Sequence, residues 1–233
     1  MTNNKITTEF HDKYENIKLI VEKSVQNIKN INSAFLDAGG GKKSVIEFKN
    51  YKKVILDISK IQLSLNNNDA TFIQADLEEF SEINKYDIVL CYDVIEHLRN
   101  PKKAIDNMLN SLVTGGILIL GAPNPVSFWG MFTKFTPYMI HRLFYKYILG
   151  SNNANKETGP FETYLRLFIR PKNIRKTYEN EKYNIVSYDV FEGFLQRLVS
   201  SKFILFKFFL AMVKLINKNF LLSNYIIVIK KIK

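Results

Sequence analysis

The chain has 233 residues, 46% of them hydrophobic, which is enough for one domain with a sizeable core and excludes a disordered chain. Its single cysteine, Cys91, excludes a disulfide framework and a cysteine-based zinc site, and it favours a reducing compartment. The first residues lead into a charged segment and not into the apolar core of a signal peptide, so we expect a cytoplasmic protein.

The first segment of the chain has the periodicity of a helix. Residues 6–29 place apolar side chains on one stripe and charges opposite, which predicts a packing helix. A strand is expected at about 32–37. Three glycines, Gly39 to Gly41, follow it at once, and a short helix is expected near 43–49.

Strands and helices alternate over the next part of the chain. Ser59 is a plausible N-cap for a helix, Pro101 opens a helix to about residue 113, and Gly115-Gly116 is expected to break it. Apolar strands are predicted at 53–57, 71–74, 86–91 and 117–120. This alternation indicates parallel βαβ units and a doubly wound sheet.

The second half of the chain is richer in helices. Two short helices are predicted in 126–149, the second beginning at Pro137, and residues 151–160 read as a polar loop. A helix at 171–181 and a strand at 184–190 follow. The pattern of residues 194–218 predicts an apolar helix with Lys207, Lys214 and Lys218 on one side. The apolar run at 225–229 predicts the last strand.

Four acids, Asp37, Asp57, Asp76 and Asp93, each come directly after a predicted strand. Ligands of open α/β sheets bind at the carboxyl ends of the strands, beside the first strand. A single strand-end acid is usually a turn or a helix cap. Four of them in register with a glycine loop indicate a cofactor site.

These stretches together resemble the class I S-adenosylmethionine-dependent methyltransferases, and most of all the ubiquinone/menaquinone-type, type 11/23-like branch. The resembling residues run in family order from Leu36-Asp37-Ala38-Gly39-Gly40-Gly41, Ile55-Leu56-Asp57-Ile58-Ser59, Phe72-Ile73-Gln74-Ala75-Asp76-Leu77 and Tyr86-Asp87-Ile88-Val89-Leu90 to Val94-Ile95-Glu96-His97-Leu98 and Gly115-Gly116-Ile117-Leu118-Ile119-Leu120. The tail is similar to the family's last two strands.

The resemblance implies an α/β fold: a doubly wound, mostly parallel, seven-stranded Rossmann-like sheet whose last strand is antiparallel, with a helical insert. It implies a single domain over residues 1–233. The expected parts are an N-terminal helix (1–30), a cofactor-binding core (31–125), a helical insert or substrate cap (126–182), and the last two strands with a basic apolar helix between them (183–233).

The resemblance also implies S-adenosyl-L-methionine as cofactor and assigns roles by position. Gly39 and Gly41, with Asp37 before them, would let the loop approach the methionine and ribose portion. Asp57 would accept hydrogen bonds from the ribose hydroxyls, as an ionised carboxylate can. The other implied cofactor contacts are Ile58 beside Asp57, Asp76 and Leu77 at the adenine, and Cys91 and Tyr92 at the amino-acid end. No metal is expected.

Methyl transfer requires a base only if the acceptor is a hydroxyl or an acidic carbon. His97, in the loop after the fourth strand, is the catalytic candidate, and a local packing role stays open. His141 reads as an interfacial residue. Lys42-Lys43 departs from the family, which often has glycine at the second position. This departure motivates an alternative, a methyltransferase-like binding protein that has lost catalysis.

The net charge of +11 lies in one half of the chain. Residues 1–124 carry 15 basic and 16 acidic side chains, whereas residues 125–233 carry 18 basic and 6 acidic ones. This asymmetry indicates a polyanionic partner. No nucleic-acid module is recognisable, so nucleic acid is not expected.

Segments 126–150 and 194–218 either cover the active site or lie on an anionic membrane surface, and the basic aromatic runs favour the membrane. We therefore expect a protein on the inner face of a membrane that methylates a small-molecule, lipid-linked or glycan acceptor.

Overall fold

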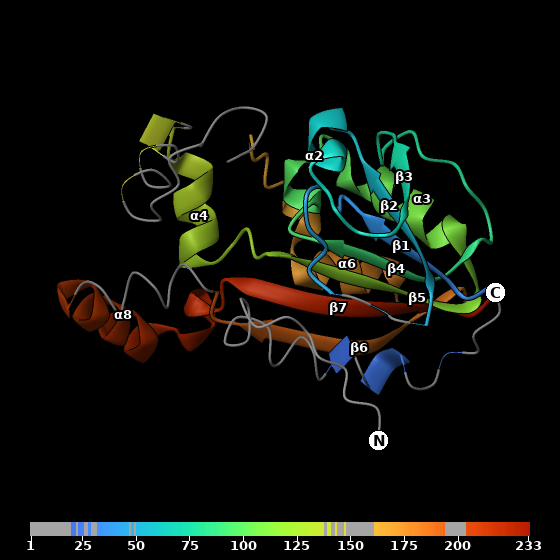
Figure 1. Cartoon of the computed structure of the whole chain (residues 1–233). Coiled ribbons are helices and arrows are strands. Elements are labelled where there is room, and N and C mark those ends of the chain that lie inside the picture. The colour runs from blue at the N-terminus through green and yellow to red at the C-terminus, as the bar shows by residue number, and fades with distance from the viewer. Residues whose placement is uncertain are drawn as a thin grey trace, which may run out of the picture.

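One seven-stranded β-sheet, in the order β3-β2-β1-β4-β5-β7-β6, forms the centre of the protein (Figure 1). The computed structural model describes residues 32–137 except 47 and 49, residues 161–193 and residues 204–233, together with scattered positions from 20 to 28 and from 139 to 147. The strands are β1 Ala34–Ala38, β2 Lys52–Asp57, β3 Thr71–Gln74, β4 Tyr86–Tyr92, β5 Leu112–Pro123, β6 Tyr183–Phe191 and β7 Asn224–Lys231.

Strand direction agrees with the predicted fold class. The β3-β2-β1-β4-β5 strands pair in parallel, whereas β7 runs antiparallel to both of its neighbours, β5 and β6. The order reverses at β1, because β2 lies on one side of it and β4 on the other. The predicted doubly wound, mostly parallel sheet with an antiparallel last strand is confirmed.

The helices begin where the sequence provides caps. Ser59 caps α2 by accepting a hydrogen bond from the backbone N–H of Gln62, and Ser127 caps α4 in the same way from Gly130. Proline opens both α3 and α6. The helices are α2 Lys60–Ser64, α3 Pro101–Ser111, α4 Phe128–Phe135, α6 Pro171–Tyr178 and α8 Ile204–Ile216, with 3₁₀ turns η2 Ile95–His97, η3 Leu167–Ile169 and η4 Lys218–Leu221.

Alternate residues of the central strands face two separate hydrophobic clusters. On one face, Leu36 of β1 and Leu118 of β5 pack with buried side chains of α3 and α6. On the other face, Phe35 and Ile119 pack with Val21 and Ile46 from the N-terminal part of the chain. A strand buried on both sides fits its nearly continuous apolar sequence.

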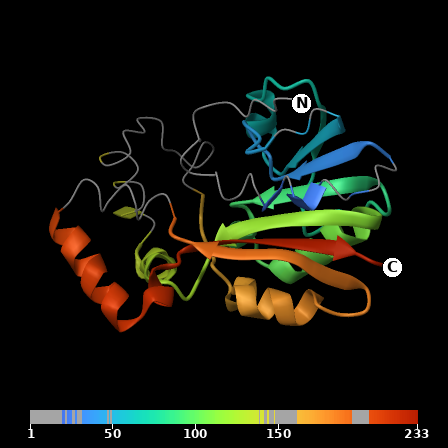
Figure 2. The same ribbon diagram turned by 90° about the horizontal axis from the view of Figure 1, so that it is seen from below.

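The carboxyl ends of β5 and β6 point toward the end of the molecule that carries α4 and α8 (Figure 2). In both Figure 1 and Figure 2, α8 stands away from the sheet. The ring of Phe128 in α4 lies 6.0 Å from that of Phe220 in η4, which connects α8 to β7. The two helices thus extend from the edge of the sheet where ligands of this architecture bind.

Three sequence predictions about local structure are wrong. Described residues between 43 and 49 form bends and not a helix, because Ile46 and Phe48 are anchored to the core and Phe48 contacts Phe35 at a ring distance of 4.7 Å. Gly115-Gly116 does not end α3 but lies inside β5. The pairing register shifts there, and Gly115 has a φ of +88°, as in a bulge.

The third error concerns the apolar helix near the C-terminus. Lys218 belongs to η4 and lies beyond the end of α8, so it does not share a helix face with Lys214.

Several predictions fall outside the described residues: most of the 6–29 helix, His141, the 151–160 loop and the 194–203 part of the apolar helix. The subdivision of the chain into four segments stays a prediction. Within the described part of the chain, no helix combines the length and the apolarity that a membrane crossing requires.

Candidate functional site

A cavity of about 520 Å³ opens at the carboxyl ends of β1, β2, β3 and β4. A segment from the second half of the chain, residues 161–164, closes its other side. The lining residues are Gly39, Leu56, Asp57, Ile58, Ser59, Ala75, Asp76, Leu77, Glu78, Asp93, Val94, His97, Leu98, Arg99, Phe161, Glu162 and Tyr164. Five of the predicted site residues, together with the catalytic candidate His97, therefore lie around one space.

The glycine loop approaches its neighbours more closely than a side chain would allow. Gly39 has a φ of +79°, and a Cβ placed on it would lie 2.4 Å from a methyl group of Val94. Its backbone N–H donates to the carbonyl oxygen of Leu56 at 2.7 Å. The buried side chain of Asn66 donates to the carbonyl oxygen of Gly41 at 2.7 Å and fixes the end of the loop. Gly39 thus lines the cavity with backbone alone.

Asp57 ends β2 and presents its carboxylate to the cavity. Burial raises the pKa of this carboxyl above its ordinary value, and hydrogen bonds from the backbone amides of Ser59 and Gly41 oppose that rise. The bond from the Ser59 amide measures 2.8 Å. Ile58, beside it, is 66% exposed at the cavity wall. The pair therefore offers a hydrogen-bond acceptor next to an apolar surface.

The segment after β3 forms the neighbouring wall. Asp76 accepts a hydrogen bond from the backbone N–H of Glu78 at 2.8 Å, so this acid is also a turn residue. The backbone of Leu77 is held by the side chain of Asn107, which donates to its carbonyl oxygen at 2.9 Å. The Glu78 carboxylate accepts from the backbone N–H of Arg99 at 2.8 Å. These contacts fix the loops after β3 and β4 to each other.

Residues 161–165 are tied to the loop after β4. The carbonyl oxygen of Glu96 accepts hydrogen bonds from the backbone N–H groups of Tyr164 at 2.9 Å and Leu165 at 3.1 Å. Leu165 is fully buried in the core and has a φ of +42°, which is uncommon for a branched side chain. Core packing thus holds a strained backbone where residues 161–165 reach the cavity.

His97 lies in η2 with its ring oriented by the same segment. Its Nδ1 atom lies 2.8 Å from the carbonyl oxygen of Glu162. A carbonyl only accepts, so Nδ1 carries the proton and Nε2 of the neutral ring holds the lone pair. Burial lowers the pKa of His97, although the hydrogen bond to Glu162 opposes this shift. The neutral, basic form is thereby favoured near pH 7.

Glu96, next to His97, is a buried acid. Its carboxyl oxygen Oε1 lies 3.9 Å from Nε2 of His97, and Oε2 has no hydrogen-bond partner among the described residues. Burial, followed by the nearby charge of Asp93, raises the pKa of Glu96 well above its ordinary value. The raised pKa favours the uncharged form of Glu96, which exerts no electrostatic effect on His97.

Four of the predicted cofactor residues do not line the cavity. Asp37 is buried beneath the loop, where a Cβ on Gly40 would lie 2.6 Å from its carboxyl group. Cys91 is fully buried in the core, and Tyr92 is 7% exposed and packs against Gly121. Gly41 lies behind the wall, where a Cβ would meet Oδ2 of Asp57 at 3.3 Å. These residues support the cavity from behind.

Lys42 and Lys43 do not narrow the cavity. Both side chains are exposed, and neither belongs to the lining. The departure from the family at this position therefore adds two solvent-facing cations beside the glycine loop and does not obstruct the site.

Sequence patterns do not predict the whole lining. They give no role to Arg99, Phe161, Glu162 or Tyr164, and they identify Asp93 only as an acid that follows a strand. The contact between His97 and Glu162 joins residues 65 positions apart, and no sequence pattern marks it. The complete lining holds five carboxylates and one arginine, which favours a cationic ligand.

Comparison with known families supports the fold. A family model described as a methyltransferase domain matches residues 36–120, the stretch that supplies most of the cavity wall. The ubiquinone biosynthesis O-methyltransferase of Rickettsia bellii is 25% identical over 150 residues, which cover 64% of this chain and 55% of that protein. The enzyme of the same name from Rickettsia prowazekii is 27% identical over 164 residues, covering 64% and 62%. The chain thus spans little more than half the length of the relatives it matches.

Solved structures show the same architecture at low sequence identity. A S-adenosylmethionine-dependent methyltransferase from Archaeoglobus fulgidus has a TM-score of 0.55 at 16% identity, with 96% of each chain covered. The [4+2]-cyclase SpnF has a TM-score of 0.56 at 13% identity, covering 98% of this chain and 84% of that one. A cyclase among these neighbours means that the fold alone does not define the reaction.

Proposed function

Because the chain belongs to the class I S-adenosylmethionine-dependent methyltransferases, we propose that it methylates a hydroxyl oxygen of a small, lipid-linked acceptor at a membrane surface. S-adenosylmethionine is the cofactor of this family. One observation carries the proposal: Gly39, Asp57 and an oriented neutral His97 line the same cavity. The acceptor and the membrane contact go beyond the family assignment.

The residues of the cavity fit this cofactor. Gly39 offers backbone without a side chain, Asp57 offers an acceptor for ribose hydroxyls, and Ile58 and Leu77 offer apolar surface for an adenine ring. The excess of carboxylates suits a ligand that carries a positive sulfur. When bound, S-adenosylmethionine would supply a methyl group on a positively charged sulfur, and the neutral thioether that remains after transfer is a good leaving group.

His97 supplies the base that a hydroxyl acceptor requires. Its Nδ1–H is committed to the carbonyl oxygen of Glu162, so Nε2 is the atom that takes a proton. The lowered pKa keeps this atom unprotonated at neutral pH. The contact between His97 and Glu162 also orients the imidazole ring of the base. The segment around Glu162, which would contact the acceptor, therefore helps to position Nε2 for proton removal.

The relatives support a lipid-linked acceptor of the hydroxyl type. Their name assigns them O-methylation in ubiquinone biosynthesis, and the chain resembles them over 64% of its length. A hydroxyl acceptor must lose a proton during methyl transfer, and His97 in the cavity could take it. An acceptor with an isoprenoid tail would be held in a membrane, so the enzyme would need to work at its surface.

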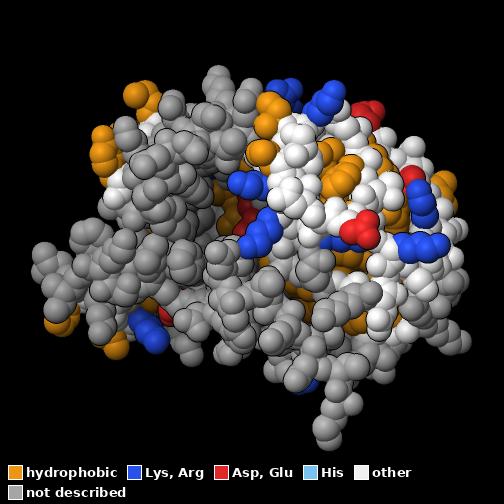
Figure 3. Space-filling view, in the orientation of Figure 1, with side chains coloured by type: hydrophobic (Ala, Val, Ile, Leu, Met, Phe, Trp, Pro, Cys, Tyr) orange, Lys and Arg blue, Asp and Glu red, His pale blue; other side chains and the backbone are white. Residues whose placement is uncertain are grey.

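The exposed faces of α4 and α8 provide such a surface. Phe208, Met212 and Leu215 of α8 follow one another at helical spacing and are 67%, 64% and 89% exposed. Phe135 at the end of α4 is 77% exposed. Figure 3 shows a few hydrophobic side chains at the margin of the molecule where α8 stands. Together with the basic excess of residues 125–233, this pattern is typical of an interfacial contact with anionic lipid.

Methyl transfer is tested with labelled S-adenosylmethionine and two acceptors, a prenylated catechol and the same catechol without its prenyl chain. We expect transfer to both, with a lower KM for the prenylated compound in the presence of anionic vesicles. Absence of transfer to either phenol would contradict the hydroxyl acceptor. Any turnover of the cofactor would exclude the alternative of an inactive binding protein.

Membrane attachment is tested by flotation with phosphatidylglycerol vesicles at low and high salt. We expect the protein to float at low salt and the triple variant Phe208→Ser, Met212→Ser, Leu215→Ser to stay in the bottom fraction. Ile83→Ser is the matched control, because Ile83 is 71% exposed but lies before the amino end of the central strand β4, away from the strand ends that carry α8. A wild-type protein that does not float, or a triple variant that floats equally well, would contradict attachment through α8.

A further inference from the structure

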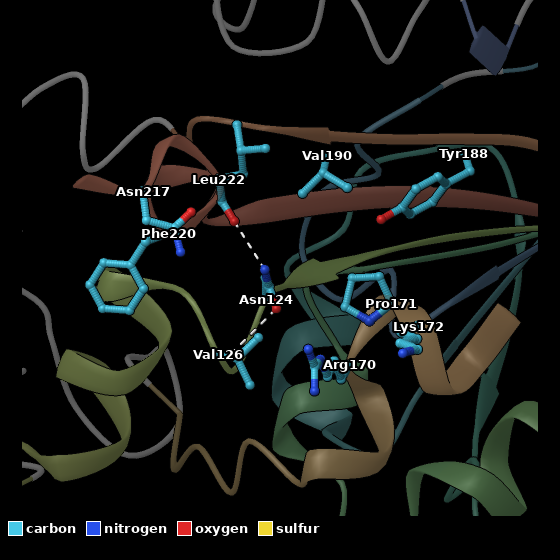
Figure 4. A pocket seen from close by; sticks show the side chains of 10 residues that line it. All are labelled: Asn124, Val126, Arg170, Pro171, Lys172, Tyr188, Val190, Asn217, Phe220 and Leu222. Carbon is cyan, nitrogen blue, oxygen red and sulfur yellow. Dashed lines mark hydrogen bonds between the residues drawn. The ribbon is translucent and has the colours of Figure 1, made fainter. Parts of the chain in front are cut away.

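A second cavity, of about 550 Å³, lies at the carboxyl ends of β5 and β6 (Figure 4). It shares no residue with the cavity described above. Its lining residues are Asn124, Val126, Arg170, Pro171, Lys172, Tyr188, Val190, Asn217, Phe220 and Leu222. Neither the family assignment nor the proposed methyl transfer uses this space.

One wall of the cavity is cationic. Arg170 and Lys172 flank Pro171 at the start of α6, and both side chains are exposed (Figure 4). Within the described part of the chain, neither forms an ion pair, and the ten lining residues include no acid. The partial positive charge of the helix start adds to theirs. Asp189, next to Tyr188 in β6, acts electrostatically on the Tyr188 phenol but does not belong to the lining. Two cations and no acid among the lining residues favour an anion at this wall.

The other walls are apolar and carry few hydrogen-bonding groups. Val126, Val190, Phe220 and Leu222 are half-buried around the space. The side chain of Asn124 is committed to the structure, because it donates to the carbonyl oxygen of Leu222 at 3.1 Å and accepts from the amide of Val126 at 3.4 Å. A small hydrated anion would leave these apolar walls unused, whereas a chain attached to the anion would cover them.

Tyr188 connects the two halves of the cavity. Its ring stacks beneath the guanidinium of Arg175, which lies 4.8 Å from the ring centroid, so the aromatic side chain is held in place. The phenol can donate a hydrogen bond to an anion beside Arg170 and Lys172. A hydroxyl donor in the same lining as two exposed cations suits a tetrahedral oxyanion.

The cavity lies next to the two helices with exposed apolar faces, which suits an amphiphilic ligand. Phe220 and Leu222 lie in the segment that joins α8 to β7, and Val126 precedes α4 by two residues. The cavity therefore lies where the two helices with exposed apolar faces join the sheet. An amphiphile that bound here with its anionic group at Arg170 would have its chain beside those helices.

We infer that this cavity binds a phosphate group carried on an apolar chain. The phosphate lies against Arg170, Lys172 and the Tyr188 hydroxyl, and the chain covers the apolar walls. Such a ligand is either a bilayer phospholipid or a single-chain phosphate ester. The inference does not depend on methyl transfer, since it concerns a separate cavity with its own lining.

The test is a calorimetric titration of the full chain with monomeric ligands. The probes are decyl phosphate, dihexanoyl phosphatidylglycerol, inorganic phosphate and the neutral amphiphile decyl glucoside. We expect at least one phosphate amphiphile to bind about tenfold or more tightly than either inorganic phosphate or decyl glucoside. Preference for phosphatidylglycerol would identify a bilayer lipid as the source, and preference for decyl phosphate a single-chain ester.

Variants connect the binding to this cavity. The pair Arg170→Ala, Lys172→Ala should weaken amphiphile binding by about tenfold or more. The control pair Lys176→Ala, Lys182→Ala removes the same charge from exposed side chains outside the lining and should bind like wild type. Unchanged melting temperatures would show that both pairs fold.

A further variant separates the two halves of the site. Val126→Ser should lower the preference for the chain without changing the affinity for inorganic phosphate. Equal affinity for inorganic phosphate and the amphiphiles would overturn the inference, as would equal loss in the two double variants. Binding of decyl glucoside as tight as that of decyl phosphate would do the same.

Discussion

The Nδ1 atom of His97 lies 2.8 Å from the carbonyl oxygen of Glu162, so a residue of the insert determines which nitrogen of the histidine can act as a base. The same insert segment is bonded through Tyr164 to the carbonyl oxygen of Glu96. Hydrogen bonds therefore join the loop after β4 to residues 162–165, and the orientation of the base depends on both segments.

The first prediction separates the two ring nitrogens of His97. His97→Asn retains a donor at the position of Nδ1 and removes Nε2, so the contact with Glu162 persists while the base is lost. We expect kcat to fall by about 10²- to 10⁴-fold, with the affinity for S-adenosylmethionine within about twofold of wild type. A steady-state assay and calorimetry measure both. Retention of kcat in this variant would show that His97 is only a packing residue.

The second prediction concerns the acid limb of the pH–rate profile. Burial lowers the pKa of His97, so the neutral base persists below the ordinary midpoint of about 6.5. Activity should stay level near pH 7 and fall as the pH drops through the lowered pKa. The folded state also binds this proton less readily than the unfolded chain. The free energy of unfolding should therefore fall as the pH drops from about 6.5 to the lowered pKa of His97. A kcat/KM profile with its acid midpoint above about 7 would contradict this account.

The third prediction compares two glycines with positive φ. Gly39 (φ +79°) would place a Cβ 2.4 Å from Val94, whereas Gly115 (φ +88°) would place one in open space. Gly115→Ala should cost only the backbone strain, about 1 kcal/mol. Gly39→Ala adds a clash and should cost roughly 2–4 kcal/mol in all. Urea unfolding measures both, and equal losses would show that the loop can shift away from Val94.

The fourth prediction concerns the buried acid Glu96. Its raised pKa means that the folded state holds a proton that the unfolded chain releases above about pH 4.3. The stability of the wild type should therefore decline relative to Glu96→Gln as the pH rises from about 4.3 towards the raised pKa, with each unit of pKa shift worth about 1.4 kcal/mol.

Urea unfolding at pH 4.5 and pH 8 measures that difference. Glu79→Gln is the control, because the side chain of Glu79 is 77% exposed and should change stability by less than about 0.5 kcal/mol. A Glu96→Gln variant whose stability relative to wild type does not change with pH would contradict a protonated Glu96.

The sequence predicted those parts of the site that lie next to each other along the chain. Asp57 follows an apolar run and Gly39 follows another, so parallel pairing of β1 with β2 brings them to one edge. These signals, with the family resemblance that they carry, were sufficient for the fold class and for five lining residues. Cys91 and Tyr92 were placed in the site by position alone, whereas side-chain alternation turns both into the core.

The rest of the site depends on contacts between distant segments. Leu165 reaches the core with an uncommon backbone conformation, and only the packed structure stabilises it. Nothing in residues 161–164 marks them as a cavity wall. The second cavity likewise joins Val126, Arg170, Tyr188 and Phe220, which are far apart in the sequence. Local periodicity contains no information on such contacts.

The central claim is that the cavity at the carboxyl ends of β1 and β2 binds S-adenosylmethionine through Asp57. Calorimetric titration of the wild type, Asp57→Ala and Asp69→Ala tests it most directly, because Asp69 is exposed and lies outside the lining. We predict that the wild type and Asp69→Ala bind the cofactor equally, and that Asp57→Ala binds about tenfold to a hundredfold more weakly. No binding by the wild type, or unchanged binding by Asp57→Ala, would contradict the account.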